Sequence, residues 1–178
     1  FEHAVYVLLL EGISRSCTHE LVRHRAGFGY SQLSQRYVDE SHAAFVMPPA
    51  IQGDPALEAA WTEQMAAAQT AYVAAVERLM EKYAEVADRV HRRKLAREAA
   101  RSVLPNGTET KIVVSGNVRA WRTMLELRLG EGAELEIRRL AIACLRVLAR
   151  EAPALFHDFE IYRSPDGTDA GRVGYHKV

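Results

Sequence analysis

The stretch Thr110-Lys-Ile-Val-Val-Ser-Gly-Asn-Val-Arg-Ala-Trp-Arg-Thr-Met-Leu-Glu-Leu-Arg128 decides the fold class of this chain, because a strand pattern passes directly into a helix pattern within it. Residues 110–114 are rich in β-branched apolar side chains, which predicts a strand. Residues 117–128 then predict a helix. Because strand and helix patterns do not alternate regularly along the whole chain, they favour an α+β fold over a doubly wound sheet.

Further helices and strands are predicted on both sides of this stretch. Helices are expected over residues 12–23, from Pro55 to about Tyr83, over 88–103 and over 134–150. Residues 4–10 fit a buried strand or the start of a buried helix, and periodicity alone does not decide between them. A short strand is expected over 35–39, and the last fifteen or so residues are expected to form a loose tail.

The predicted helix that begins at Pro55 carries a narrow apolar seam. Its members are spaced alternately by four and three residues, as in a heptad repeat: Trp61, Met65, Ala68, Tyr72, Ala75 and Leu79. Such a seam packs against another helix, either of the same subunit or of a second subunit. The sequence leaves both arrangements open.

Composition limits the classes of protein to which the chain can belong. With 178 residues, 48% apolar and 26% charged, it is expected to form one soluble domain. Its 23 basic and 23 acidic residues balance, so we expect neither nucleic acid nor a membrane as a partner. Two cysteines without a disulfide framework fit a reducing cytoplasm. The chain opens at Phe1 without an initiator Met, and a further segment is expected to precede it.

The segment from Glu20 to Tyr37 is the richest in groups that could bind a ligand. It contains Arg23-His24-Arg25, then a loop with Gly27 and Gly29, two serines and Arg36. Backbone N–H groups of such a loop, together with guanidinium forks, make a cradle for phosphate or another oxyanion. A solvated basic turn is the alternative interpretation.

Motifs of other cofactor classes are missing. Gly27-x-Gly29 is followed by Gln32 where the dinucleotide fingerprint requires a third glycine. The seven histidines form no pattern of metal ligands, so no metal site is expected. Cys17 and His19 raise the possibility of a Cys/His nucleophile. Their spacing on a helix turns the two side chains apart, however, which favours a buried structural thiol at Cys17.

A second group of polar residues, Arg101, Asn117, Arg119 and Arg128, follows later in the chain. On one helix Asn117 and Arg128 would share a stripe to within about 20° but lie about 16 Å apart along the axis. They would therefore serve different ends of a long ligand, or different ligands. Arg119 and Arg122 also fit ordinary charges on a helix surface, which is the interpretation we prefer for Arg122.

These residues together resemble the signature of the flavin-dependent thymidylate synthases, which is Arg-His-Arg, seven residues, then Ser. Here Arg23-His24-Arg25 is followed by Gln32-Leu-Ser-Gln-Arg-Tyr37, with eight residues between Arg25 and Ser34. The segments Phe1-Glu-His3, Arg101-Ser-Val-Leu-Pro105 and Asn117 to Arg128 are similar to further family segments in the same order, and the resemblance runs to about residue 162.

The resemblance implies one domain over residues 1–178 that lacks its N-terminal segment. Its fold would be α+β, with a small, mostly antiparallel sheet flanked by long helices, and it would assemble as a homotetramer with active sites shared between subunits. FAD would contact seven residues: Arg23, His24, Arg25, Gln32, Asn117, Arg119 and Thr123. The substrate dUMP would contact nine: Glu20, Arg23, Gln32, Leu33, Ser34, Gln35, Arg36, Arg101 and Arg128.

The implied reaction is the reductive methylation of dUMP to dTMP, with methylenetetrahydrofolate as carbon donor and NADPH-reduced FAD as hydride source. Carbon 5 of uracil must become nucleophilic, and no cysteine suits covalent attack at C6. The fixed positive charge of Arg128 would instead stabilise negative charge at N3 and the flanking carbonyls. Ser34 has no obvious base beside it and is expected to position the substrate. A nucleotide-binding module without catalysis and a nucleic-acid-binding helical protein are the alternatives.

Overall fold

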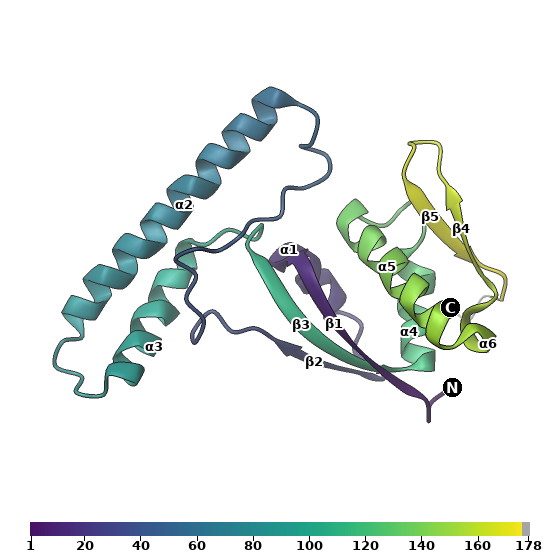
Figure 1. The fold of residues 1–178 in the computed structure, drawn as a ribbon, viewed down its shortest axis with the longest axis horizontal. Coiled ribbons are helices and arrows are strands. Elements are labelled where there is room, and N and C mark those ends of the chain that lie inside the picture. Colours follow the sequence, from purple (N-terminus) through teal and green to yellow (C-terminus); the bar gives the residue numbers. More distant parts are fainter. Residues whose placement is uncertain (176–178) are drawn as a thin grey trace. The chain divides into compact units, whose positions relative to one another are not determined.

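The computed structural model describes residues 1–175, and the chain divides into two compact units. The first unit holds residues 1–13, 17–31 and the chain from 112 onward, and the second holds 14–16 and 32–111. The colours of Figure 1 follow the chain through both units. Each unit is therefore assembled from segments that are distant in the sequence.

A three-stranded antiparallel sheet lies largely in the first unit, with the strand order β1-β3-β2 (Figure 1). Its strands are β1 (Val5–Ser14), β2 (Phe28–Gln32) and β3 (Glu109–Asn117). The strand predicted at 110–114 is confirmed, and β3 extends it at both ends. Along β3, Ile112 and Val114 are buried while Val113 between them is 40% exposed, so the core lies on one face of the sheet.

Strand β1 answers the open question about residues 4–10, which form a strand and not a helix. Only one face of that strand is buried. Leu10 is 7% exposed, whereas Val5, Val7 and Leu9 are 59%, 62% and 59% exposed. The expectation of a wholly buried segment is therefore wrong, because apolar side chains occupy both faces and the chain covers only one. The strand also continues through Ser14, so the helix expected over 12–23 begins only at Arg15.

The helices of the first unit are α1 (Arg15–Leu21), α4 (Val118–Arg128), α5 (Leu135–Glu151) and the short α6 (Pro153–Phe156). The helices predicted over 117–128 and 134–150 are confirmed. The Asn117 side chain accepts a hydrogen bond from the Ala120 N–H at 2.8 Å and so caps α4. Trp121 is fully buried in the core, with its ring edge-on to Phe28 at 5.0 Å.

An antiparallel hairpin, β4 (Phe159–Arg163) and β5 (Asp169–Val173), follows the helices. The expectation of a loose C-terminal tail is wrong for these residues, and the remainder of that tail, residues 176–178, lies outside the described part. The polar residues that suggested a tail form the hairpin turn. There the Asp166 carboxylate accepts the Thr168 N–H at 2.9 Å, and Gly167 adopts a φ of +77°.

The second unit contains a helix pair, α2 (Pro55–Lys82) and α3 (Arg89–Ala100), followed by the 3-10 helix η1 (Arg101–Val103). Both helices are capped by the aspartate that precedes them. Helix α2 packs against α3. The middle of the predicted seam (Met65, Ala68 and Tyr72) is buried, so it packs within one chain. No helix in residues 1–175 combines the length and the apolar character needed to cross a membrane.

The strand predicted over 35–39 is wrong, because these residues form turns closed by hydrogen bonds from the N–H groups of Tyr37 and Val38 to the Ser34 carbonyl. The strand lies earlier, in β2, where two glycines had indicated a loop. A Cβ on Gly29 would lie 2.8 Å from Ser115 Oγ on the neighbouring strand. Glycine at this position therefore permits close strand approach.

Candidate active site

The Arg23-His24-Arg25 loop connects α1 to β2 in the first unit. The N–H of His24 donates to the Leu21 carbonyl at the end of α1. The hydroxyl of Tyr30, on β2, lies 3.0 Å from the Leu21 carbonyl oxygen and 2.5 Å from that of His24. Burial raises the pKa of Tyr30 to about 12, so the hydroxyl keeps its proton at neutral pH. Tyr30 thus ties the loop to the sheet.

Arg128, in the last turn of α4, joins this loop to α1. Its Nε donates to His24 Nε2 at 3.0 Å, and its Nη1 donates to Glu20 Oε2 at 2.9 Å. The side chains of Arg128 and Glu20 are 24% and 37% exposed. No residue of the described chain bonds to Nη2 of Arg128, so that edge of the guanidinium can still donate to a ligand. Three predicted site residues are therefore one hydrogen-bonded group.

The imidazole of His24 is neutral in this arrangement. Its burial lowers the pKa, and the positive charge of Arg128 lowers it further. Because Nε2 accepts the hydrogen bond from Arg128, we assign the single ring proton to Nδ1. His24 therefore serves as an acceptor that orients Arg128, in addition to lining the cavity described next.

A cavity of about 290 Å³ lies between the loop and the first turn of α4. Its lining residues are Glu2, His24, Arg25, Ala26, Gly27, Phe28, Asn117, Arg119, Ala120 and Thr123. Gly27 has a φ of +77°, and a Cβ on it would lie 2.9 Å from the Asn117 side chain. Glycine is thus required for the loop to approach the helix so closely. Two arginines and a helix N-terminus make the cavity suitable for an anionic ligand.

The structure brings most of the predicted FAD residues to this one cavity. Five of the seven line it: His24, Arg25, Asn117, Arg119 and Thr123. Arg23 is exposed and does not line the cavity, and Gln32 belongs to the second unit. Sequence reasoning missed Glu2, which lines the cavity and pairs with Arg119 at 2.9 Å. The sequence feature that could have identified Glu2 is its position in the Phe1-Glu-His3 segment, which resembles a family segment.

The residues expected to contact dUMP fall in both units. Glu20, Arg23 and Arg128 belong to the first. The other six belong to the second: Gln32, Leu33, Ser34, Gln35, Arg36 and Arg101. Within the second unit Ser34 Oγ accepts the Arg36 N–H at 3.4 Å, and the Arg36 guanidinium pairs with Glu98 at 2.7 Å. Among the predicted dUMP residues, the structure thus joins Glu20 to Arg128 in the first unit and Ser34 to Arg36 in the second.

Sequence reasoning passed over two charged residues of the second unit, Arg15 and Glu40. The guanidinium of Arg15 donates to the Leu33 carbonyl at 3.2 Å, and burial lowers its pKa. Glu40 is 8% exposed, and its pKa is raised by burial although the charge of Arg15 opposes the shift. These opposite charges support the turn that carries the predicted dUMP residues. Burial is what distinguishes Arg15 and Glu40 from other charged residues, and no sequence motif indicates their burial.

Arg122, which we assigned to the helix surface, is buried. Its guanidinium donates to both carboxylate oxygens of Asp158, at 2.7 and 2.5 Å, and to the Leu155 carbonyl at 2.6 Å. The side chains of Arg122 and Asp158 are 7% and 6% exposed. The guanidinium also lies 4.8 Å from the ring centre of Phe159. The surface interpretation is wrong because the partner comes from a distant segment that helical periodicity does not reveal.

The two cysteines are free, buried thiols. Burial raises the pKa of Cys17 and raises that of Cys144 to about 12. Since the thiolate is the nucleophilic form, neither group is reactive at neutral pH. The interpretation of Cys17 as a buried thiol is confirmed.

An α+β fold in which a basic loop and a helix N-terminus meet at one cavity is typical of proteins that bind phosphate-bearing ligands. Comparison with known sequences defines the class further. The profile of the thymidylate synthase complementing protein family matches residues 1–154, and the chain belongs to this family.

Curated relatives extend the similarity over nearly the whole chain. The flavin-dependent thymidylate synthase of Mycobacteroides abscessus is 55% identical over 168 residues, which cover 94% of this chain and 67% of that protein. The enzymes of the same name from Mycobacterium avium and Mycobacterium bovis are 54% and 53% identical over the same shares. The family resemblance stated from the motif is therefore confirmed.

Proposed function

We propose that this protein is a flavin-dependent thymidylate synthase that converts dUMP to dTMP, with methylenetetrahydrofolate as carbon donor and NADPH as reductant. Family membership supports the class of reaction. The observation that carries the proposal is the placement of Arg128 between Glu20 and His24. These hydrogen bonds join Arg128, the expected catalytic residue, directly to Glu20, which is expected at the substrate, and to His24, which is expected at the flavin.

The residues of the cavity fit part of an FAD molecule. The N-terminal turn of α4, Arg25 and Arg119 suit its diphosphate, and His24 and Thr123 offer further polar contacts. A volume of about 290 Å³ lies just below the usual range of roughly 300–1,000 Å³ for whole ligand sites, so further residues must complete it. FAD, when bound, supplies the hydride for the methyl group.

Arg128 is the proposed catalytic residue. Its unpartnered Nη2 edge would donate to the uracil ring of dUMP and stabilise the negative charge that develops at N3 and the flanking carbonyls. Glu20 and His24 hold the guanidinium in a fixed orientation, so it need not reorganise during the reaction. The other residues proposed to contact dUMP are Arg23, Gln32, Leu33, Ser34, Gln35, Arg36 and Arg101.

We further propose that the chain assembles as a homotetramer with shared active sites and works in the cytoplasm. The apolar outer face of β1 supports association, since Val5, Val7 and Leu9 are each more than half exposed. Light scattering should give a tetrameric mass, and Val7→Glu should lower that mass. Val147→Glu, at an exposed apolar position on α5, is the control. A monomeric mass for the unchanged protein would refute the homotetramer. An unchanged tetrameric mass for Val7→Glu would show that the outer face of β1 does not form the interface.

The whole proposal is tested on purified protein by its visible spectrum and by NADPH oxidation. We expect a yellow protein whose NADPH oxidation in the presence of methylenetetrahydrofolate depends on dUMP, with reactions lacking dUMP as control. A protein that binds dUMP but is colourless and inert would instead be a nucleotide-binding module. The double variant Cys17→Ser/Cys144→Ser should remain active, because both thiols are protonated and buried.

A further inference from the structure

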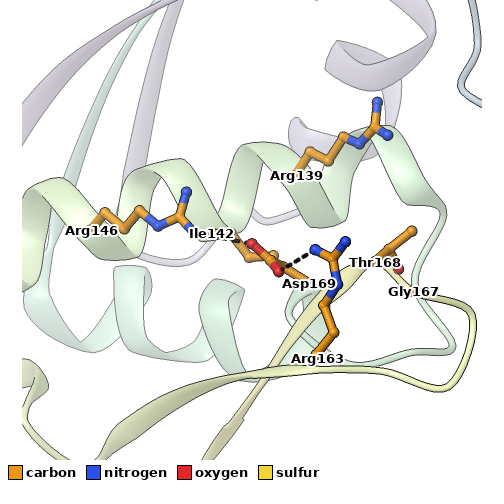
Figure 2. A pocket seen from close by; sticks show the side chains of 7 residues that line it. All are labelled: Arg139, Ile142, Arg146, Arg163, Gly167, Thr168 and Asp169. Carbon is orange, nitrogen blue, oxygen red and sulfur yellow. Dashed lines mark hydrogen bonds and ion pairs between the residues drawn. The ribbon is translucent and has the colours of Figure 1, made fainter.

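A second cavity, of about 260 Å³, lies between α5 and the β4–β5 hairpin of the first unit. It shares no residue with the candidate active site, and its lining residues are Arg139, Ile142, Arg146, Arg163, Gly167, Thr168 and Asp169. Figure 2 shows Arg139 and Arg146 projecting from the helix and Arg163 and Asp169 from the hairpin. Three arginines against one aspartate give this lining a net charge of +2 (3 − 1).

Asp169 holds two of the guanidinium groups without using up their donors. Its carboxylate accepts Arg146 Nη2 at 3.0 Å and Arg163 Nη1 at 2.9 Å, as the dashed lines in Figure 2 mark. Each guanidinium has five N–H groups, so most remain for a ligand. The side chains of Arg146 and Arg163 are 61% and 71% exposed, and a ligand can reach them from solvent.

Arg139 is the third cation and has no partner of its own within residues 1–175. It precedes Arg146 by seven residues, which on a helix is about two turns, so both emerge from the same face within about 20°. Its long side chain can turn toward the other two, because no hydrogen bond holds it elsewhere. Arg139 adds an unpaired positive charge to a cavity whose lining is already positive. This charge favours the binding of an anion in the cavity.

Hydrogen bonds hold the hairpin turn that forms the wall of the cavity opposite α5. In the hairpin turn Asp166 accepts hydrogen bonds from the N–H and the hydroxyl of Thr168, at 2.9 and 2.6 Å. Arg138, 3% exposed, donates to Thr168 Oγ1 at 2.9 Å from beneath. Arg138 belongs to α5, and its Nε and Nη1 atoms are buried without a hydrogen-bond partner in the described chain. A pre-formed site loses little entropy when a ligand binds.

We propose that this cavity binds a phosphate dianion, either free or as the phosphate group of a small ester. The net charge of the lining matches a dianion, and guanidinium forks from the helix and from the hairpin would each donate to its oxygens. The volume equals that of about eight or nine waters at roughly 30 Å³ each, which leaves room beside a phosphate for the organic part of an ester.

Isothermal titration of the whole protein with inorganic phosphate, and separately with ribose 5-phosphate, tests the proposal at an ionic strength held constant with chloride. The variant Arg139→Gln/Arg163→Gln should weaken binding about ten-fold or more, because charge-assisted hydrogen bonds are lost. The control Arg150→Gln/Arg172→Gln removes the same charge from α5 and from the hairpin but outside the cavity, and should change binding by less than about two-fold.

The two probes distinguish the source of the phosphate. Tighter binding of ribose 5-phosphate supports an ester as the ligand, and equal or weaker binding supports the free anion. The Nε–H signals of Arg139, Arg146 and Arg163 in NMR spectra should shift saturably with either probe. Affinity that is equal in the two double variants, or signals that chloride shifts as much as phosphate, would overturn the site.

Discussion

Arg122 and Arg128 lie six residues apart on α4, and each pairs with a carboxylate, but their surroundings differ sharply. Arg122 and Asp158 are 7% and 6% exposed, and two hydrogen bonds join them. Arg128 and Glu20 are 24% and 37% exposed, and one hydrogen bond joins them. Both terminal nitrogens of Arg122 have partners within the protein, whereas Nη2 of Arg128 has none in the described chain. The first pair stabilises the helix that presents the second.

This difference shows how one helix can serve both stability and chemistry. A buried charge needs a counter-charge beside it, because an unpaired charge in the interior costs several kcal/mol. A group that must bind a ligand has to remain partly unmatched until the ligand arrives. The exposure of the guanidinium therefore distinguishes the functional arginine from the structural one, whereas residue type and helical position do not.

Removal of the buried carboxylate should have the largest effect. Asp158→Ala is expected to lower the free energy of unfolding by about 3–5 kcal/mol, because Arg122 would be left buried without its partner. Urea denaturation measures this, with Glu151→Ala in the exposed pair with Arg150 as control at about 0–1 kcal/mol. If Asp158→Ala lowers the free energy of unfolding no more than the control does, the buried Arg122 pair contributes no more to stability than an exposed pair, and the contrast with Arg128 fails.

The same pair should also respond to acid. Hydrogen bonds from Arg122 lower the pKa of Asp158, so the carboxylate stabilises the fold above the usual aspartate pKa of about 3.9. That contribution should disappear as the pH falls through the lowered value in the folded state.

Removal of the partly exposed Arg128 should affect turnover more than stability. Arg128→Ala is expected to lower kcat about 100- to 1,000-fold, by analogy with the loss of one donor to a developing negative charge. Flavin absorbance should persist, and the free energy of unfolding should change by about 0–1 kcal/mol. Arg150→Ala controls for the loss of a helix charge. Near-normal turnover in Arg128→Ala would contradict the proposed catalytic role of Arg128.

Titration of His24 should sharpen the comparison further. Its pKa is lowered in the folded protein by burial and by Arg128, so the unfolded chain binds a proton more readily. Stability should therefore fall as the pH drops below the unperturbed value of about 6.5 and level off below the folded pKa. His24→Gln retains an acceptor for Arg128 but cannot titrate, so its stability should decline less between pH 7 and 5. Parallel curves for the two proteins would contradict this cause.

The smallest effect is expected at a third arginine of the same helix. Arg119 and Glu2 form a pair whose side chains are 62% and 63% exposed. Glu2→Gln should change the free energy of unfolding by less than about 1 kcal/mol, and added salt should reduce even that. A loss comparable with that of Asp158→Ala would show that exposure does not rank the three pairs.

Much of the local structure was predictable from the sequence. The strand at 110–114, the helices that begin after Asp54, Asp88 and Asn117, and the helix over 134–150 follow from β-branched runs, capping residues and breakers. The Arg-His-Arg motif also led to the family that the comparisons show. These are short-range properties, because each depends on residues within a few positions of one another.

Only the tertiary structure revealed which side of each element is covered. It buried Arg122 against Asp158, paired residues 159–163 with 169–173, left one face of β1 exposed, and placed Glu20, His24 and Arg128 in one group across more than 100 residues. Helical periodicity reports the direction of a side chain but not the segment it meets. Burial and ion pairing depend on that segment, and so they are decided when the chain packs.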